Sequence, residues 1–224
     1  DVAKAMKESI EAGAVQARFD KAASTGDENP ARLAMTKNIA AAILKQVPVR
    51  ETFAVIDYGC GTGLLTLELQ PRVSRIIGMD TSPGMLAVLK KKIDALGLNN
   101  VETQSLDLTT QPPPAIKVDL IVSAMALHHI ADVPLVLGKL VKMLVPGGYL
   151  ALADLDTEAG NFHTDKTGVF HTGFERAGLL EILETIGLKE IAAVTAHTVE
   201  RPTEDGLRSF SLFLISGQMP TSTP

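Results

Sequence analysis

Three glycines stand at alternate positions in the segment Gly-Cys-Gly-Thr-Gly at 59–63, directly after the apolar stretch 53–56. Glycines in such a loop let a ligand approach the backbone closely at the start of a helix. The dinucleotide fingerprint needs a glycine where Leu64 stands, and the phosphate loop needs a lysine that is absent here. Asp57, two residues before the first glycine, would repel a pyrophosphate. The loop therefore favours a ligand that carries positive charge and no phosphate, the alternative being a tight turn without a ligand.

Two further acids follow later strands. Asp80 ends the apolar stretch 75–79, where a carboxylate can accept hydrogen bonds from both hydroxyl groups of a ribose. Asp107 follows the stretch 101–106 and can accept from the exocyclic amine of an adenine. S-adenosylmethionine combines these groups with an ammonium and a sulfonium. The alternatives are a helix-capping role for Asp80 and an ordinary loop position for Asp107.

Histidines and one more acid are the candidates for acid–base chemistry. His128 and His129 are adjacent, so their side chains point apart and one of them can line a cleft while the other is structural. Asp154 ends a strand, and His163 and His171 lie in the long polar segment that follows it. Long loops at the carboxyl end of a strand often build binding sites. General bases are therefore one interpretation, with a helix-capping turn, surface histidines and a metal site as alternatives; we expect no metal.

Strands and helices alternate in the central part of the chain. The segments 53–56, 75–79, 101–106, 118–123 and 149–153 read as strands, and the segments 30–46, 64–69, 82–97 and 133–144 read as helices. Such alternation predicts a parallel sheet with right-handed crossovers. The carboxyl ends of its strands would bring the glycine loop and the three acids to one crevice.

The last part of the chain follows a different pattern. A helix over 174–186 precedes two strands, 188–199 and 207–216, whose six-residue turn is too short for a crossover helix, so this pair must be antiparallel. Residues 30–216 are predicted to form one domain with a loop insertion at 154–173, and residues 217–224 a loose tail. Residues 1–29, with a weak apolar face at Ile10, Ala14 and Phe19, are predicted to form a helical lid.

These features together resemble the class I S-adenosylmethionine-dependent methyltransferases. The stretches that carry the resemblance are 55–63, 77–85, 105–108, 118–130 and 144–149. The sequence Ser-Ala-Met-Ala-Leu-His-His-Ile at 123–130 looks most like the subgroup of the ubiquinone and menaquinone biosynthesis methyltransferases, which act mainly on small molecules. The resemblance implies an α/β, Rossmann-like fold: a seven-stranded, mostly parallel sheet with an antiparallel last strand and helices on both faces.

The resemblance also implies roles for particular residues. The methionine part of the cofactor would lie against the glycine loop, and Asp57 would organise that loop. Asp80 would hold the ribose, and the adenine edge would be read by Asp107 and the Leu108 amide. The whole predicted cofactor set is Asp57, Gly59, Cys60, Gly61, Gly63, Asp80, Thr81, Met85, Asp107, Leu108, Ser123 and Met125. The predicted catalytic candidates are His128, His129, Asp154, His163 and His171.

Composition narrows the class of acceptor. The chain has 224 residues and a net charge of −5, with one cysteine and nine aromatic residues, none of them tryptophan. A strong electrostatic grip on nucleic acid or on an anionic membrane is therefore not expected. We expect a small-molecule acceptor. The single cysteine rules out an internal disulfide and favours a reducing compartment, and no apolar run reaches the length of a membrane span, so we expect a cytoplasmic protein. Two alternatives stay open, namely a nicotinamide oxidoreductase and a catalytically silent S-adenosylmethionine-binding partner protein.

Overall fold

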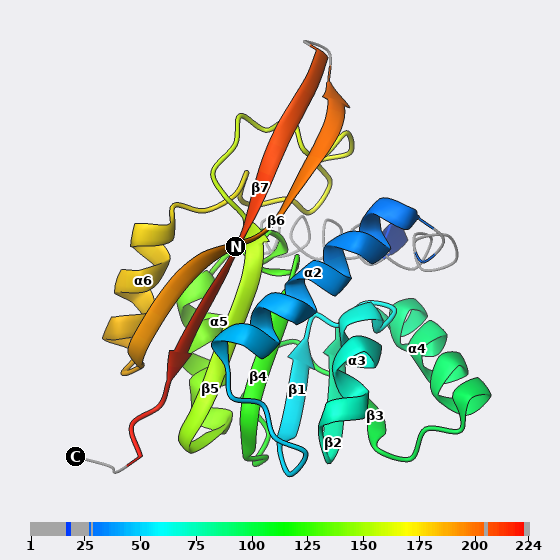
Figure 1. Ribbon diagram of the computed structural model, residues 1–224, viewed down its shortest axis with the longest axis vertical. Coiled ribbons are helices and arrows are strands. Elements are labelled where there is room, and N and C mark those ends of the chain that lie inside the picture. The colour runs from blue at the N-terminus through cyan, green and yellow to red at the C-terminus, as the bar shows by residue number, and fades with distance from the viewer. Residues whose placement is uncertain (1–16, 19–26, 28, 204–205, 222–224) are drawn as a thin grey trace, which may run out of the picture.

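A single seven-stranded sheet forms the centre of the molecule (Figure 1). The computed structural model describes residues 17–18, 27, 29–203 and 206–221. The strand order is β3-β2-β1-β4-β5-β7-β6, and β7 runs antiparallel to both of its neighbours while β1 to β5 are parallel. This architecture confirms the predicted fold class, including the antiparallel last strand.

The elements follow the predicted alternation closely. The strands are β1 Ala54–Tyr58, β2 Arg75–Asp80, β3 Val101–Ser105, β4 Val118–Ala124, β5 Leu144–Leu155, β6 Lys189–Thr203 and β7 Gly206–Gln218. The α-helices are α2 Pro30–Gln46, α3 Leu64–Leu69, α4 Pro83–Leu96, α5 Val133–Leu140 and α6 Arg176–Thr185. Short 3-10 helices occupy Gln70–Arg72 (η2), Leu127–His129 (η3) and Val141–Met143 (η4).

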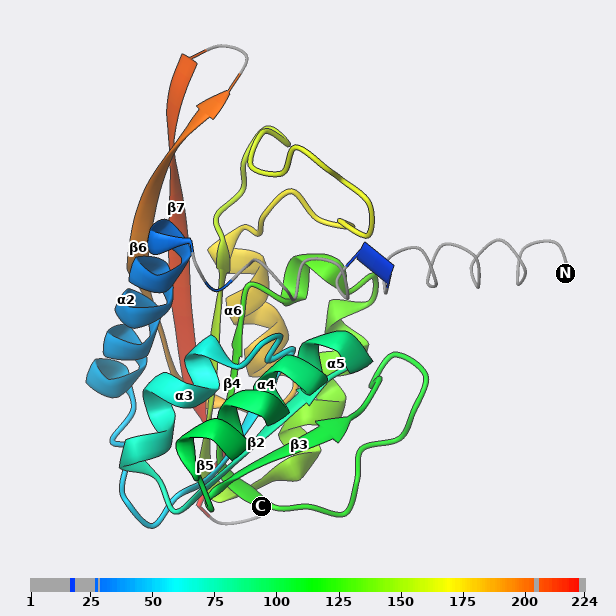
Figure 2. The same ribbon diagram turned by 90° about the vertical axis from the view of Figure 1, so that its right-hand side faces the viewer.

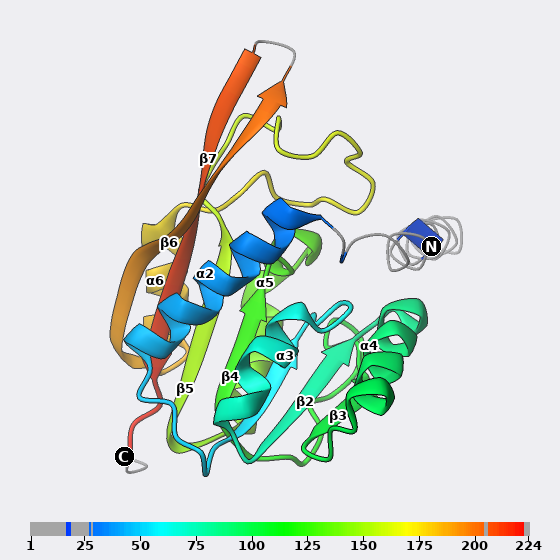
Figure 3. The same ribbon diagram turned by 45° about the vertical axis from the view of Figure 1, so that its right-hand side comes forward.

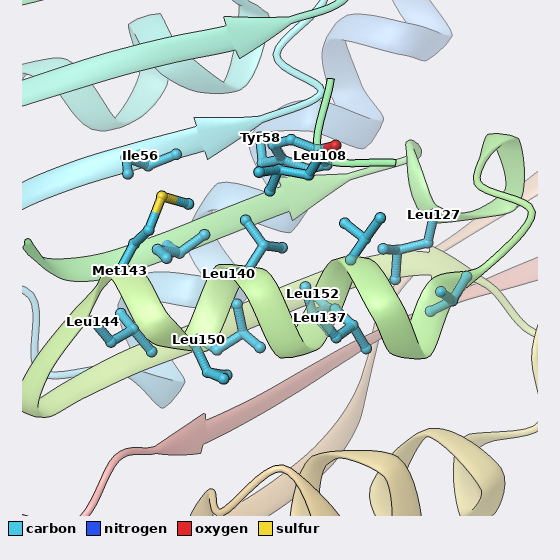
Figure 4. Packing of buried hydrophobic residues seen from close by; sticks show 14 of the residues in the cluster. Ile56, Tyr58, Leu108, Leu127, Leu137, Leu140, Met143, Leu144, Leu150 and Leu152 are labelled. Atoms are coloured by element: carbon cyan, nitrogen blue, oxygen red, sulfur yellow. The ribbon is translucent and has the colours of Figure 1, made fainter. Parts of the chain in front are cut away.

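Helices cover both faces of the sheet because its central strands are apolar on both sides (Figure 2). In β1 the side chains alternate, so Val55 points toward α2, α3 and α4 while Ile56 points toward α5 and α6. Figure 3 shows α2 lying across the sheet on the first of these faces. On the other face, Leu137 and Leu140 of α5 pack over Ile56 and Leu152 (Figure 4).

Local capping fixes where two of the helices begin. The Asn29 side chain accepts hydrogen bonds from the first backbone amides of α2, and the Ser82 hydroxyl accepts from Met85 in α4. Both helices carry a proline in their first turn, as the sequence predicted. The cap on α4 bears on the site, because it sets the path of the chain directly after the strand end at Asp80.

The terminal hairpin is longer than predicted. Arg201, Pro202 and Thr203 were expected in the turn, but they pair with Arg208, Leu207 and Gly206 in the β6–β7 ladder. Pro202 is tolerated because β6 is an edge strand, where a missing N–H need not break the ladder. The paired strands therefore project beyond the other strands as an arm (Figure 1).

The tail expected to be loose from Gly217 is attached over its first residues. Gly217 and Gln218 pair with β5, and the Met219 amide donates to the Gly148 carbonyl at 2.8 Å. At the other end of the chain, the predicted apolar face of residues 1–29 lies outside the described residues. No helix within the described ranges is both long and apolar enough to cross a membrane.

Candidate functional site

The glycine loop between β1 and α3 adopts a backbone that side chains rarely allow. Gly59, Gly61 and Gly63 have φ values of 71°, 54° and 81°. A Cβ atom on Gly59 would lie 2.4 Å from the Ala126 Cβ, so the loop there touches the chain that follows β4. At Gly61 the nearest atom would be the Met85 sulfur at 3.9 Å. Of the three loop glycines, Gly61 is thus the one at which a Cβ atom would meet no clash.

Amides of the glycine loop are already engaged within the protein. The Gly59 and Cys60 amides both donate to the Met79 carbonyl, at 2.8 and 3.0 Å. The Gly61 amide donates to the Asp80 carboxylate at 2.8 Å, and the second oxygen of that carboxylate accepts from Ser82. The amides of residues 59–61 are therefore used to shape the loop, which suits a cationic ligand better than a phosphate because a cation needs oxygen acceptors rather than N–H donors.

Asp57 lies buried beneath this loop. Its carboxylate accepts a 2.6 Å hydrogen bond from the Thr66 hydroxyl of α3. Burial raises the pKa of Asp57 to about 7; the hydrogen bond from Thr66 opposes this rise and the charge of Asp80 adds to it. A positive ligand near the loop would favour the ionised form of Asp57, so the predicted organising role has an electrostatic basis.

We expect Asp57→Asn to stabilise the ligand-free protein at pH 8 by about 1–3 kcal/mol. The pKa of Asp57 in the folded protein lies above its value of 3.8 in the unfolded chain, so folding stability is lost as the pH rises from about 4 to about 7, and the loss is complete at pH 8. The asparagine cannot ionise and still accepts from Thr66. Thermal unfolding at pH 4 and pH 8 measures the effect. A variant no more stable than the native protein at pH 8 would contradict it.

The predicted adenine contacts have partners of their own. The Asp107 carboxylate accepts from the Thr109 amide and hydroxyl and from the Thr110 hydroxyl, which closes a local turn. The Leu108 backbone makes a hydrogen bond to the Tyr58 hydroxyl, and the Leu108 side chain is buried in the core. An adenine role for these two residues remains a prediction.

The chain after β4 turns sharply toward the glycine loop. The Ser123 hydroxyl is buried and donates to the Tyr58 carbonyl at 2.8 Å, so it joins β4 to β1 rather than standing free. Met125 has a φ of 55°, which is uncommon for a residue other than glycine. Such strained backbone tends to cluster at functional sites. Thr81 is exposed and Met85 buried at the start of α4, on the Gly61 side of the loop.

His128 and Asp154 form a buried pair at the ends of β4 and β5. The His128 Nδ1 lies 2.7 Å from the Asp154 Oδ1, and the two side chains are 1% and 0% exposed. The Asp154 carboxylate also accepts from the backbone amides of His128 and Leu155. A carboxylate held in this way orients the ring with its proton on Nδ1 and leaves Nε2 as the basic atom.

His129 and His163 complete a cluster of three imidazole rings. The ring centre of His128 lies 4.1 Å from that of His129 and 4.8 Å from that of His163. The His129 Nδ1 donates to the Gly168 carbonyl at 2.7 Å. Burial, reinforced by the neighbouring His128 ring, lowers the pKa of His129 and of His163 to about 4. Both rings are therefore neutral at pH 7.

His171 does not join this cluster. Its Nε2 donates to the Ile130 carbonyl at 2.9 Å, and its ring lies 5.0 Å from that of Phe174. These contacts help to fasten the segment 156–174 over η3, and so do hydrogen bonds from Phe170 and His171 amides to the His128 carbonyl. In the described part of the chain, no group of three His, Cys, Asp or Glu side chains has a geometry that could hold a metal ion.

Two residues of the N-terminal segment, Asp27 and Arg18, reach the site, and neither was predicted as a site residue. The Asp27 carboxylate accepts from the Thr62 hydroxyl and pairs with Lys92, both at 2.5 Å. Arg18 pairs with Asp165 at 3.1 Å and donates to the Thr167 carbonyl. Asp27 therefore contacts the glycine loop, and Arg18 contacts the segment 156–174.

Asp156 holds the two ends of the segment 156–174 in place, a role that the sequence analysis did not predict. Asp156 makes two 2.7 Å hydrogen bonds to the Arg176 guanidinium and accepts from the Ser211 hydroxyl. A Cβ atom on Gly173 would lie 2.2 Å from the Asp156 carbonyl oxygen, so the two ends of the segment meet closely. This clamp holds the segment beside the histidine cluster.

Known methyltransferases resemble this chain in sequence. Residues 55–148 match the family described as "Methyltransferase domain". An uncharacterized methyltransferase of Schizosaccharomyces pombe is 33% identical over 156 residues, which cover 63% of this chain and 55% of that protein. A trans-aconitate 2-methyltransferase of Deinococcus radiodurans is 31% identical over 183 residues, covering 72% of this chain and 68% of that protein.

A solved structure shares the fold. An S-adenosylmethionine-dependent methyltransferase from Aquifex aeolicus superposes with a TM-score of 0.64 and 22% identity, covering 91% of this chain and 98% of that one. The chain spans about half the length of the first curated relatives that it matches.

Proposed function

Because the chain belongs to the class I S-adenosylmethionine-dependent methyltransferases, we propose that it transfers a methyl group from S-adenosylmethionine to a small-molecule acceptor. One observation carries the proposal. The glycine loop, where a Cβ on Gly61 would meet no clash, follows β1, and the buried His128–Asp154 pair lies at the ends of the neighbouring strands β4 and β5. The cofactor loop and the candidate base therefore lie at the same edge of the sheet, beyond the carboxyl ends of its strands, where open α/β sheets bind ligands.

Several residues fit the cofactor. The methionine part would lie beside Gly61, where no described atom stands closer than 3.9 Å to the position of a Cβ. Asp80 would receive the ribose hydroxyls while it keeps the Gly61 amide in place. Thr81 and Met85 would flank the ribose and the adenine, and Asp107 would keep its predicted place at the adenine amine. The buried Asp57 supplies negative charge for the cationic part of the ligand.

We expect Asp80→Ala to weaken S-adenosylmethionine binding by about 1–3 kcal/mol, or roughly 5- to 150-fold. The substitution removes a charged acceptor and also releases the Gly61 and Ser82 amides that the carboxylate holds. Calorimetric titration of the purified chain measures the change. Asp94→Ala is a suitable control, because Asp94 pairs only with Lys90 on the exposed side of α4 among the described side chains. Equal affinity in Asp80→Ala and Asp94→Ala would contradict the role of Asp80.

The surroundings of the crevice favour a small acceptor. The segment 156–174 is fastened over η3, and Arg18 contacts its outer part. These contacts place polypeptide over the chain that follows β4, which leaves less room for a macromolecular acceptor than for a small one. The net charge of −5 disfavours nucleic acid. Relatives named trans-aconitate 2-methyltransferase and demethylmenaquinone methyltransferase support the same acceptor class.

Methyl transfer requires alignment above all. Bound S-adenosylmethionine would supply an electrophilic methyl group on a sulfonium. The protein has to hold the acceptor in line with that group, exclude water and, for an acceptor that arrives protonated, take up a proton. His128 would take the proton at Nε2, and Asp154 would stabilise the resulting imidazolium, because its carboxylate already faces Nδ1.

The decisive experiment has two parts. Titration of the chain with S-adenosylmethionine, S-adenosylhomocysteine and NAD should show micromolar binding of the first two only. Release of S-adenosylhomocysteine should then be measured with a panel of small acceptors. Binding without turnover for any acceptor would favour the alternative of a silent cofactor-binding protein, and binding of NAD alone would favour an oxidoreductase.

A further inference from the structure

We infer that the methyl acceptor carries two neighbouring oxygens, one of them a hydroxyl group, and that His128 receives the hydroxyl while His163 binds the second oxygen. The inference rests on the proposed function and names its acceptor class. An ortho-diphenol and an α-hydroxy carbonyl compound are the simplest members of that class.

The first observation is an unsatisfied nitrogen. The His163 Nε2 is buried and has no hydrogen-bond partner among the described residues. A buried polar atom left in this state costs about 1–3 kcal/mol, so a protein rarely keeps one without a use. The remaining contacts of the ring are with other rings, those of His128, His129 and Phe162. A ligand atom beside His163 would supply the missing hydrogen bond.

The second observation is the distance to the base. The ring centres of His128 and His163 are 4.8 Å apart, and the rings are tilted by 38°. Two imidazoles this close cannot serve groups at opposite ends of an acceptor. An acceptor that contacts both rings therefore presents groups that lie close together, as oxygens on neighbouring carbons do. Because Asp154 fixes the His128 proton on Nδ1, the Nε2 of His128 accepts, and a hydroxyl group is the donor that it requires.

Charge around the cluster favours oxygen over nitrogen as the attacking atom. The guanidinium groups of Arg18 and Arg201 both act on His163 and oppose its protonation. Arg201 stacks on the Phe162 ring, 3.9 Å from its centre, and donates to the Phe162 carbonyl. Arg18 is paired with Asp165, so Arg201 adds most to the positive charge here. Positive charge near His163 opposes the charge that develops on an amine nitrogen as it accepts a methyl group, whereas it stabilises the negative charge that develops when a hydroxyl group loses its proton.

The reaction then balances without a further reactant. An oxygen lone pair of the hydroxyl group forms the bond to the methyl carbon, and the electron pair of the breaking carbon–sulfur bond stays on sulfur. The hydroxyl proton passes to the His128 Nε2 and leaves to solvent after the transfer. The products are a methyl ether, S-adenosylhomocysteine and a proton. His163 is a positioning residue in this scheme, since it contacts the oxygen that does not react.

The test compares three probes on the full chain: catechol, phenol and aniline. With the native protein, kcat/KM for catechol should exceed that for phenol at least tenfold, and aniline should not react. His163→Phe keeps a ring of similar size but removes the nitrogen. It should raise the KM for catechol about tenfold and lower kcat/KM for phenol by a clearly smaller factor, so that the preference for catechol over phenol falls. His163→Gln, which restores a polar group, should recover part of the loss.

His171→Phe is the matched control, because His171 anchors the same segment but lies outside the cluster. It should affect catechol and phenol equally. Calorimetry with catechol and S-adenosylhomocysteine gives a readout independent of turnover, since only catechol affinity should fall in His163→Phe.

Three results would overturn the inference. They are equal losses for catechol and phenol in His163→Phe, a preference for aniline, and binding of S-adenosylmethionine without methylation of either hydroxyl probe. Failure to bind S-adenosylmethionine at all would instead refute the proposed function.

Discussion

Gly61→Val should abolish binding of S-adenosylmethionine, with an affinity loss of at least about 100-fold, which corresponds to about 2.7 kcal/mol. Gly61 has a φ of 54°, and a Cβ there would meet no clash, so a valine side chain would occupy the position proposed for the methionine part of the ligand. The left-handed conformation itself costs a valine about 1–2 kcal/mol, which lowers the melting temperature only modestly. Calorimetric titration and thermal unfolding of the same sample separate the two effects.

Gly59→Ala provides the contrast to this substitution. Its Cβ would lie 2.4 Å from the Ala126 Cβ, a contact that the backbone must move to relieve. We expect a loss of folding stability of about 3 kcal/mol. The two glycines share a loop and a positive φ but differ in what stands beside them. If Gly61→Val binds the ligand as the native protein does, the loop does not face the cofactor.

Asp154→Asn should reduce methyl transfer by about 100- to 10,000-fold while the affinity for S-adenosylmethionine stays within about twofold. The carboxylate holds the His128 proton on Nδ1 and would stabilise the imidazolium that forms during transfer. An asparagine keeps the shape but loses the charge, and its amide group can leave the wrong nitrogen protonated. Single-turnover kinetics with an identified acceptor measures the loss directly.

Asp156→Asn is the matched control for this prediction. Asp156 stands two residues further along the chain and clamps Arg176 and Ser211 at the root of the segment 156–174. Its substitution should lower the melting temperature, yet leave the pH dependence of turnover as it is in the native protein. If Asp154→Asn and Asp156→Asn lower turnover equally, Asp154 acts by holding the segment in place and His128 is not the base.

Elements defined by nearby residues were predictable from the sequence. The glycine loop, the caps at Asn29 and Ser82 and the alternating apolar strands all depend on residues a few positions apart. The antiparallel terminal hairpin followed from the short connection between its strands. The same reasoning failed where a local signal misled: Pro202 suggested a turn, but an edge strand accepts a proline.

Asp80 and Asp107 were predictable from their places at strand ends, but their hydrogen-bond partners within the protein were not. Asp107 was predicted from its strand end, yet its carboxylate closes a turn with Thr109 and Thr110. Asp80 was predicted as a ribose acceptor, and the structure adds its second task of holding the Gly61 amide. Such competing partners depend on the exact path of the loop, which residue type and spacing do not specify.

The composition of the histidine cluster was decided by tertiary structure alone. His128 and His163 are 35 positions apart, and nothing in their spacing distinguishes His163 from His171. The clamp at Asp156 and the hydrogen bonds to η3 hold the segment 156–174 so that His163 reaches the His128 ring while His171 turns to Ile130. Contacts between distant parts of a chain depend on how whole elements pack, whereas backbone conformation and capping depend on neighbouring residues; the sequence therefore specified the loop that would hold the cofactor, and only the packed fold could specify which histidines stand together beside it.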